Sequence, residues 1–88
     1  MEYLIFSYPN CPSCESLKKE LAKSPFPGRE YNLVDKEGKM KIRDYLKAIN
    51  RDEKGAIILP TLLMLDNEKV EKVINTPQEL QSWLRSKD

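Results

Sequence analysis

The chain has 88 residues, which is enough for one domain near the lower size limit of unaided folding. Its 15 Lys and Arg against 14 Asp and Glu leave a formal charge of +1, so composition gives no electrostatic case for nucleic acid or an anionic membrane. No apolar run reaches the roughly 18 residues of a membrane span, and the N-terminus lacks the pattern of a signal peptide. We therefore expect a single cytoplasmic domain over residues 1–88, with no nucleic-acid or membrane partner.

The first half of the chain predicts a strand, a helix and a second strand. Residues 3–6 form a short β-favouring run, which indicates a buried strand. A helix can begin at Pro12, because a missing N–H costs nothing at the first helical position. The Ser-Pro-Phe-Pro-Gly segment at 24–28 ends this helix, and residues 30–34 indicate the second strand. The apolar positions on one face of the helix are Cys14, Leu17 and Leu21.

The second half predicts a helix, a hairpin and a final helix. The first of these helices is expected at about residues 38–50, and the next strand should begin just after Pro60. A fourth strand at 69–74 has poor alternation, because Lys72 shares a face with apolar neighbours. Residues 76–79 form a capping box that opens the final helix. The side chains that this helix should bury are Leu80, Trp83 and Leu84.

The resulting order is β-α-β-α-β-β-α. Two strands joined by a helix imply a parallel pair with a right-handed crossover. The last two strands, joined by a tight turn, imply an antiparallel hairpin. We therefore predict an α/β fold with a mixed four-stranded sheet flanked by helices.

The two cysteines of the chain, Cys11 and Cys14, lie in one Cys-Pro-Ser-Cys motif. In the cytoplasm such a close pair is more often catalytic or metal-binding than structural. A thiol at a helix start is near unsatisfied backbone N–H groups, which favour the thiolate. Cys11 should therefore be an exposed nucleophile, and Cys14, one turn inside, should resolve the mixed disulfide. Pro12 and Ser13 should set the balance between dithiol and disulfide.

A metal site is the alternative interpretation of this spacing. Two thiolates are half of a tetrahedral site, and the chain has neither a histidine nor a third cysteine. A metal would need carboxylates, water or a second subunit. The competing function is therefore a non-enzymatic module, a dimer bridged by zinc or an iron–sulfur cluster through Cys11. The absence of histidine also excludes serine–histidine and cysteine–histidine hydrolysis.

The sequence resembles the thioredoxin superfamily and, within it, the glutaredoxins. The resemblance rests on the motif at 11–14 after a short strand, on Leu-Pro-Thr at 59–61, and on the closing hairpin and helix. It implies a thioredoxin-like fold and a monomeric dithiol–disulfide oxidoreductase without a bound cofactor. It also implies a cis peptide bond before Pro60, with the backbone of Leu59 turned toward the cysteines. An extended segment of a protein disulfide client could pair there.

Chain length and the Cys-Pro-x-Cys motif favour the glutaredoxin branch, but three positions depart from it. Tyr8 replaces a basic residue, Ser13 replaces an aromatic one, and residues 73–75 replace glycines that let glutathione approach the backbone. Thr76 and the start of the last helix offer another place for a carboxylate. Glutathione and a thioredoxin-reductase-type flavoenzyme both remain candidate external reductants. The substrate-binding residues that the resemblance implies are Tyr8, Pro12, Ser13, Leu59, Pro60, Asn75 and Thr76.

Overall fold

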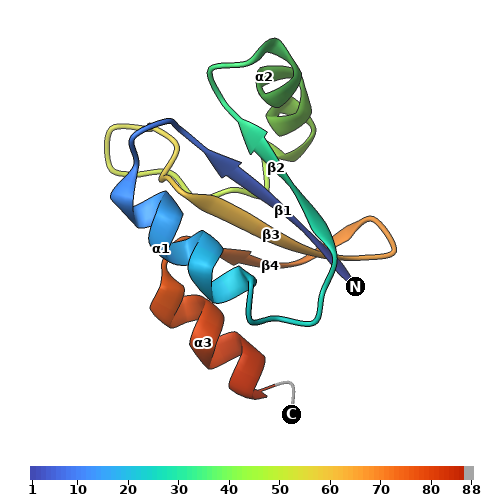
Figure 1. Ribbon diagram of the computed structural model, residues 1–88. Coiled ribbons are helices and arrows are strands. Elements are labelled where there is room, and N and C mark those ends of the chain that lie inside the picture. Colours follow the sequence, from blue (N-terminus) through green and yellow to red (C-terminus); the bar gives the residue numbers. More distant parts are fainter. Residues whose placement is uncertain (87–88) are drawn as a thin grey trace.

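The computed structural model describes residues 1–86 of the chain, so the last two residues of the predicted domain lie outside the described part. The elements follow the predicted order, with one additional 3-10 turn, η1 (Figure 1). They are β1 (Glu2–Ser7), α1 (Pro12–Leu21), β2 (Gly28–Asn32), α2 (Lys36–Ile42), η1 (Arg43–Tyr45), β3 (Thr61–Asp66), β4 (Lys69–Ile74) and α3 (Pro77–Ser86).

The strands form one mixed four-stranded sheet, as predicted, and their order in it is β2-β1-β3-β4. β1 pairs in parallel with β2 and antiparallel with β3, and β3 pairs antiparallel with β4. In this register Phe6 lies opposite Tyr31 on one side and Thr61 on the other. The end of β1 and the start of β3 therefore lie at the same edge of the sheet.

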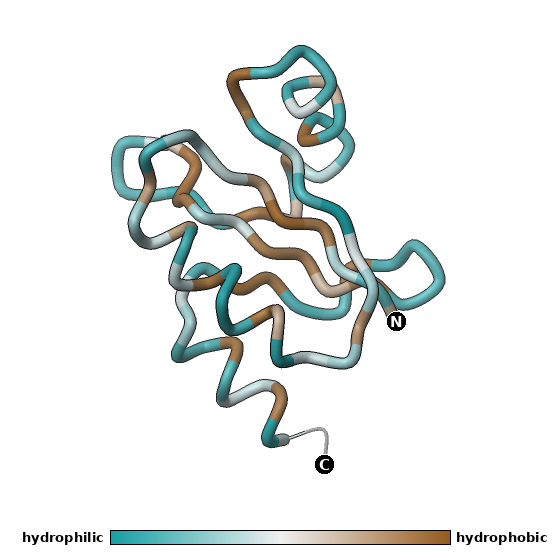
Figure 2. Tube along the Cα trace, in the orientation of Figure 1, coloured by the Kyte–Doolittle hydropathy of each residue, from teal (hydrophilic) through white to brown (hydrophobic). Residues whose placement is uncertain are grey.

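Helices cover both faces of the sheet. Figure 1 shows α1 and α3 side by side, away from α2. Because both faces of β1 and β3 are covered, these strands are apolar at successive positions instead of alternating, and they appear brown in Figure 2. The buried core beside α2 consists of Leu4, Phe6, Leu33, Ile42, Ile49, Leu63 and Leu65. The buried core beside α1 and α3 consists of Ile5, Leu17, Leu21, Leu62, Met64, Ile74 and Leu80.

β2 begins and ends two residues before the predicted strand at 30–34. Gly28 opposes Tyr3 in the parallel pair, and a β-carbon at Gly28 would overlap the Tyr3 ring. Gly28 was expected only to help end the preceding helix. Its lack of a side chain also leaves room for the Tyr3 ring in the parallel pair. At the other end, the Asn32 side chain accepts a hydrogen bond from the Val34 N–H at 3.0 Å and turns the chain.

α2 is shorter than the predicted helix at 38–50. It begins after Asp35, which has extended backbone angles, and gives way to η1 at Arg43. After η1 the chain continues in turns, in which the Tyr45 carbonyl accepts from the Ala48 N–H at 2.9 Å and from the Ile49 N–H at 3.2 Å. The helical spacing of apolar residues therefore continues through tight turns instead of through one regular helix.

A bulge explains the poor alternation of the fourth strand. Met64 opposes Lys72 whereas Leu65 opposes Val70, so one residue of β4 is left over between them. The bulge brings Val70 and Val73, three positions apart, against the same core beside α2. Lys72 remains exposed.

Thr76 caps α3 as the predicted capping box requires, but the Glu79 carboxylate accepts from the Thr76 hydroxyl, where a full capping box would use the Thr76 N–H. The Glu79 N–H donates to Thr76 Oγ1 at 3.1 Å, and this hydroxyl donates to Glu79 Oε1 at 3.2 Å. Leu80 is fully buried, while Trp83 and Leu84 are half-buried against the same core. No helix within residues 1–86 is long and apolar enough to cross a bilayer.

Candidate active site

Cys11 is the N-cap of α1, with Pro12 at the first helical position. Its backbone is extended, with φ −110° and ψ 101°, so the helix begins at the residue that the sequence predicts. The Cys14 N–H donates to Cys11 Sγ at 3.1 Å, and the Glu15 N–H donates to the Cys11 carbonyl at 3.1 Å. A sulfur in this position receives an N–H group of the first helical turn, which is the arrangement that stabilises a thiolate.

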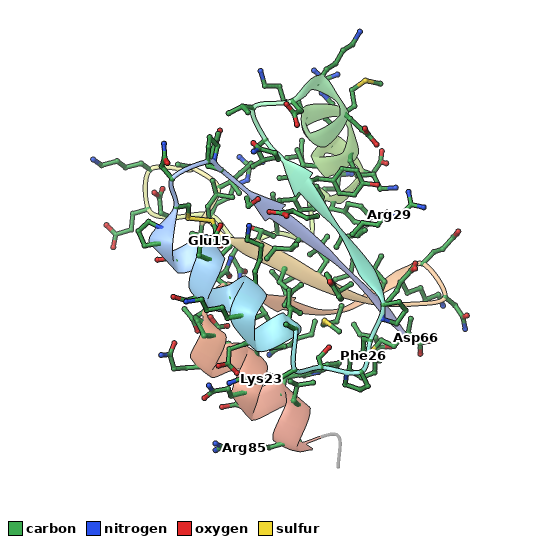
Figure 3. All side chains as sticks on the ribbon, in the orientation of Figure 1. Glu15, Lys23, Phe26, Arg29, Asp66 and Arg85 are labelled. Carbon is green, nitrogen blue, oxygen red and sulfur yellow. A yellow bond between two sulfur atoms is a disulfide. The ribbon has the colours of Figure 1, made fainter. Side chains whose placement is uncertain are left out.

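Cys11 and Cys14 form a disulfide at the start of α1, seen as the yellow bond in Figure 3, with their Cα atoms 5.2 Å apart. The two residues differ in exposure. Cys14 is 1% exposed, whereas Cys11 is only half-buried. The expected difference in access is therefore present, and the assigned roles of nucleophile and resolving thiol stay predictions.

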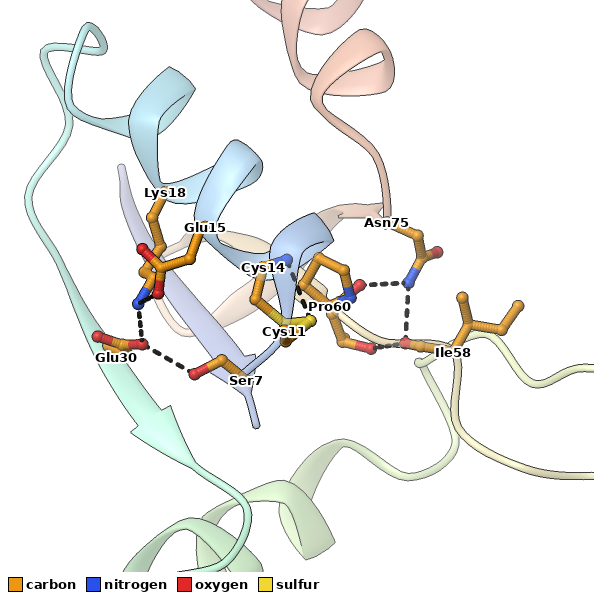
Figure 4. Close-up of a disulfide and its surroundings, with 10 residues drawn as sticks. Ser7, Cys11, Cys14, Glu15, Lys18, Glu30, Ile58, Pro60 and Asn75 are labelled. Atoms are coloured by element: carbon orange, nitrogen blue, oxygen red, sulfur yellow. Dashed lines mark hydrogen bonds and ion pairs between the residues drawn. A yellow bond between two sulfur atoms is a disulfide. The ribbon is translucent and has the colours of Figure 1, made fainter. Parts of the chain in front are cut away.

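The loop before β3 lies beside the disulfide, with Pro60 drawn against the sulfurs in Figure 4. The Leu59–Pro60 peptide bond is cis, as the resemblance implied. Pro60 is buried and Leu59 is half-buried. Within residues 1–86, the N–H and C=O of Leu59 take part in no hydrogen bond, so this peptide segment keeps a free donor and a free acceptor beside the disulfide.

The carbonyls on either side of Leu59 are occupied. Ile58 O accepts from Thr61 Oγ1 at 2.6 Å and from Asn75 Nδ2 at 3.2 Å. Pro60 O accepts from the same Asn75 Nδ2 at 3.0 Å, and Asn75 Oδ1 accepts from Asn50 Nδ2 at 2.7 Å. The polar atoms of the Asn75 side chain are thus engaged within the chain, although this residue was predicted to contact substrate.

The other predicted binding residues gather at the same edge of the sheet. Tyr8, which follows β1, is 45% exposed, and Pro12 and Ser13 are exposed at the start of α1. Thr76 is also exposed, but its hydroxyl serves the capping box of α3. Pro12 and Ser13 thus lie between the two cysteines and Tyr8 lies three positions before Cys11, and all three residues are exposed.

Sequence reasoning missed two features of this region. The first is Asn50, which lay at the end of an expected helix and gave no signal of its own. The second is a charge cluster of Ser7, Lys18 and Glu30, drawn beside the disulfide in Figure 4. Glu30 Oε2 accepts from Ser7 Oγ at 2.8 Å and pairs with Lys18 Nζ at 2.9 Å, which ties α1 to β2.

The charge cluster shifts the protonation of both its ionisable members. Hydrogen bonds to Glu15 and then to Glu30 raise the pKa of Lys18. The hydrogen bond from Lys18, supported by the one from Ser7, lowers the pKa of Glu30. Both groups therefore stay charged near neutral pH, and the contact between α1 and β2 is an ion pair there.

Replacing Glu30 with glutamine should lower the free energy of unfolding by about 0.5–1 kcal/mol at neutral pH, as for other exposed ion pairs. Because folding lowers the pKa of Glu30, the advantage of the wild type is present above the unfolded value of about 4.3. It is lost as the pH falls through the folded value. Denaturant unfolding of both proteins at neutral pH and in strong acid tests the prediction. Glu53→Gln in the exposed loop is the control. A loss of the same size in strong acid would contradict it.

The described residues contain no third ligand that would complete a metal site with the cysteine pair. Within residues 1–86, no group of three or more His, Cys, Asp or Glu side chains is placed to hold a metal ion. A metal or cluster at the cysteine pair would therefore need ligands from water or from a second subunit, two of the sources that the sequence left open.

Comparison with solved structures shows the fold. The chain is similar to thioredoxin 1 from the thermophilic eubacterium Thermosipho africanus, with a TM-score of 0.63 and 13% sequence identity. The match covers 99% of this chain and 98% of that one. No protein-family model matches the sequence, and neither does any curated protein. The protein therefore has a thioredoxin-like fold with a Cys-x-x-Cys pair at the start of its first helix.

This similarity removes one argument for the glutaredoxin branch. Thioredoxin 1 is matched over almost its whole length, so chain length does not separate the present protein from thioredoxins. The Cys-Pro-x-Cys motif remains the sequence feature that favours glutaredoxins, and that subtype stays a prediction.

Proposed function

We propose that the protein is a cytoplasmic, monomeric thiol–disulfide oxidoreductase that reduces protein disulfides through Cys11 and Cys14. One observation carries the proposal: the sulfur of Cys11 caps α1 and receives the Cys14 N–H at 3.1 Å, beside the Pro60 loop. A half-buried sulfur held at a helix start is suited both to attack and to leave as a thiolate.

The reaction transfers two electrons from the dithiol to the client. The Cys11 thiolate attacks one sulfur of the client disulfide, whose S–S bond breaks, and the other client sulfur leaves and takes up a proton. The Cys14 thiol then loses its proton and attacks Cys11 Sγ. This step breaks the mixed disulfide, forms the Cys11–Cys14 bond and releases the second client thiol.

The free backbone groups of Leu59 favour an extended client. A residue that offers both its N–H and its C=O can exchange two hydrogen bonds with one residue of an antiparallel strand. Ile58, which precedes Leu59 in the chain, is 36% exposed. Disulfides in extended segments of other proteins are therefore the clients that we propose.

A flavoenzyme of the thioredoxin-reductase type is the external reductant that we favour over glutathione. Residues 73–75 lack the glycines that let glutathione approach the backbone, and the Thr76 hydroxyl, which could have received its carboxylate, is bonded to Glu79. The protein itself needs no bound cofactor, because the two thiols carry the electrons.

The test begins with the reduced protein at mildly acidic pH, where brief alkylation followed by peptide mapping should label Cys11 selectively. Equal, slow labelling of both cysteines would contradict the assigned roles. The oxidised protein is then offered reduced glutathione, or NADPH with a thioredoxin reductase, and thiol recovery is followed. We expect recovery with the flavoenzyme. Recovery with glutathione alone would assign the protein to the glutaredoxin type, and freshly purified protein carrying a metal would favour the cluster module.

A further inference from the structure

We propose that Asn75 is a positioning residue whose side-chain amide holds the loop at 58–60 in the shape that presents Leu59 to a client. This inference deepens the proposed function and rests on it. Asn75 follows β4 and is 8% exposed, so its polar atoms have little access to water. It reaches a loop that lies 15 to 17 positions earlier in the sequence.

The chemistry of the neighbours fixes how the Asn75 amide is turned. Ile58 O and Pro60 O can only accept hydrogen bonds, so the NH₂ group of Asn75 must face them. Its oxygen then faces outward, where Asn50 Nδ2 donates to it at 2.7 Å. All the buried polar atoms of this cluster are therefore paired, and the described residues contain no buried side-chain nitrogen or oxygen without a partner.

The two bonds from Asn75 bracket Leu59. They engage the carbonyl before it and the carbonyl after it, which leaves the N–H and C=O of Leu59 as the free groups of this segment. A loop held at both sides of one residue loses little further freedom when a client binds. The bonds do not involve Cys11 or Cys14.

Asn50 fastens the same loop from the other side. Its carbonyl accepts from the Ile58 N–H at 3.3 Å, next to an antiparallel bridge between Arg51 and Ile57. A tight turn closes this small hairpin, because Asp52 Oδ1 accepts from the Lys54 N–H at 2.9 Å and from a further N–H in the turn. The loop at 58–60 is thus held by the hairpin on one side and by Asn75, after β4, on the other. We call these contacts the clamp.

Because the clamp holds the segment that would bind an extended client, we expect it to affect client binding and not the attack by Cys11. Binding of an extended client uses the Leu59 backbone, whereas a small disulfide needs only access to Cys11. Loss of the clamp should therefore raise the concentration of protein client that half-saturates the reaction and leave attack on a small disulfide unchanged. A residue with a merely structural role would affect both substrates alike.

The experiment uses the reduced full chain in single-turnover reactions with insulin, a protein disulfide, and with cystamine, a small one. Reactions are stopped with acid and the remaining thiols are alkylated and counted by mass. The variants are Asn75→Ala and Asn50→Ala. Asn75→Ala removes two hydrogen bonds to backbone carbonyls, and Asn50→Ala removes the one from its side chain to Asn75 Oδ1. The matched control is Asn32→Ala, which removes one hydrogen bond between an asparagine side chain and the backbone outside the loop at 58–60. Circular dichroism and thermal unfolding establish that each variant is folded.

For insulin, we expect the half-saturating concentration to rise about tenfold in Asn75→Ala, as for the loss of one or two hydrogen bonds. We expect a rise of about threefold in Asn50→Ala. Cystamine rates and the pH profile of Cys11 alkylation should match the wild type. If Asn75→Ala fails to fold, the exposed Asn50→Ala variant decides. Unchanged insulin saturation, or equal losses for both substrates, would overturn the clamp. Inability of the wild type to reduce either disulfide would instead overturn the proposed function.

Discussion

Replacing Cys14 with serine should stop turnover and leave the protein covalently joined to its client. Cys11 can still attack, because its position at the helix start does not require the second sulfur. The mixed disulfide then has no neighbouring thiol to resolve it. Multiple turnover should fall by roughly a thousandfold or more, as for other variants that lack an essential catalytic group. The adduct is detected by non-reducing electrophoresis and by the mass of the linked peptides.

Two further variants sharpen this prediction. Cys11→Ser should form no adduct and should show the same loss of turnover, because the buried Cys14, at 1% exposure, cannot reach a large client. Cys14→Ala should trap the client as Cys14→Ser does, which separates the loss of the thiol from the introduction of a buried hydroxyl. An adduct through Cys14 in the Cys11→Ser variant would contradict the division of roles.

Replacing Gly38 with alanine should destabilise the fold, although alanine is the better helix former. Gly38 is buried in α2 against the last residue of β2, and a β-carbon there would lie 2.8 Å from the carbonyl carbon of Asn32 and still closer to its oxygen. Overpacking of this kind costs about 1–3 kcal/mol or more, while the gain in helix propensity is only about 1 kcal/mol. Because the obstructing atoms belong to backbone, we expect the upper part of that range and a net loss of about 2 kcal/mol.

Chemical denaturation of Gly38→Ala measures this loss, with Lys39→Ala on the exposed side of the same helix as control. The control should change the free energy of unfolding by less than about 0.5 kcal/mol, as most surface substitutions do. A Gly38→Ala protein more stable than the wild type would show that α2 can move away from β2 at little cost. The close contact would then not be what holds the helix in place.

The elements that sequence predicted well are those that carry their own boundary signals. Pro12 begins α1, Thr76 caps α3, and Pro60 precedes β3, and each acts on neighbours within a few positions. The two elements with shifted boundaries, β2 and α2, depend on contacts across the sheet. Gly28 admits the Tyr3 ring into the parallel pair, and such a contact has no signature in the local sequence.

The candidate site also contains both kinds of feature, those with a local sequence signal and those that depend on contacts between distant segments. The cysteines could be found because their spacing and their place before a helix are local features, and the cis bond before Pro60 followed from the family resemblance. The role of Asn75 could not be found. Its partners lie at 58, 60 and 50, and the pairing with Asn50 spans 25 positions, which only the folded sheet brings together.

The capping of α1 by Cys11 has a consequence for the partly folded chain. In the proposed function, the reactivity of this thiol depends on the first turn of α1, because the N–H that bonds the sulfur lies only three residues along the chain. Discrimination between clients, in contrast, needs segments that meet only when the sheet is complete. A chain that is still being synthesised, or that is unfolding, would therefore react with disulfides without discriminating between clients. Selectivity between clients would appear only once the fold is complete.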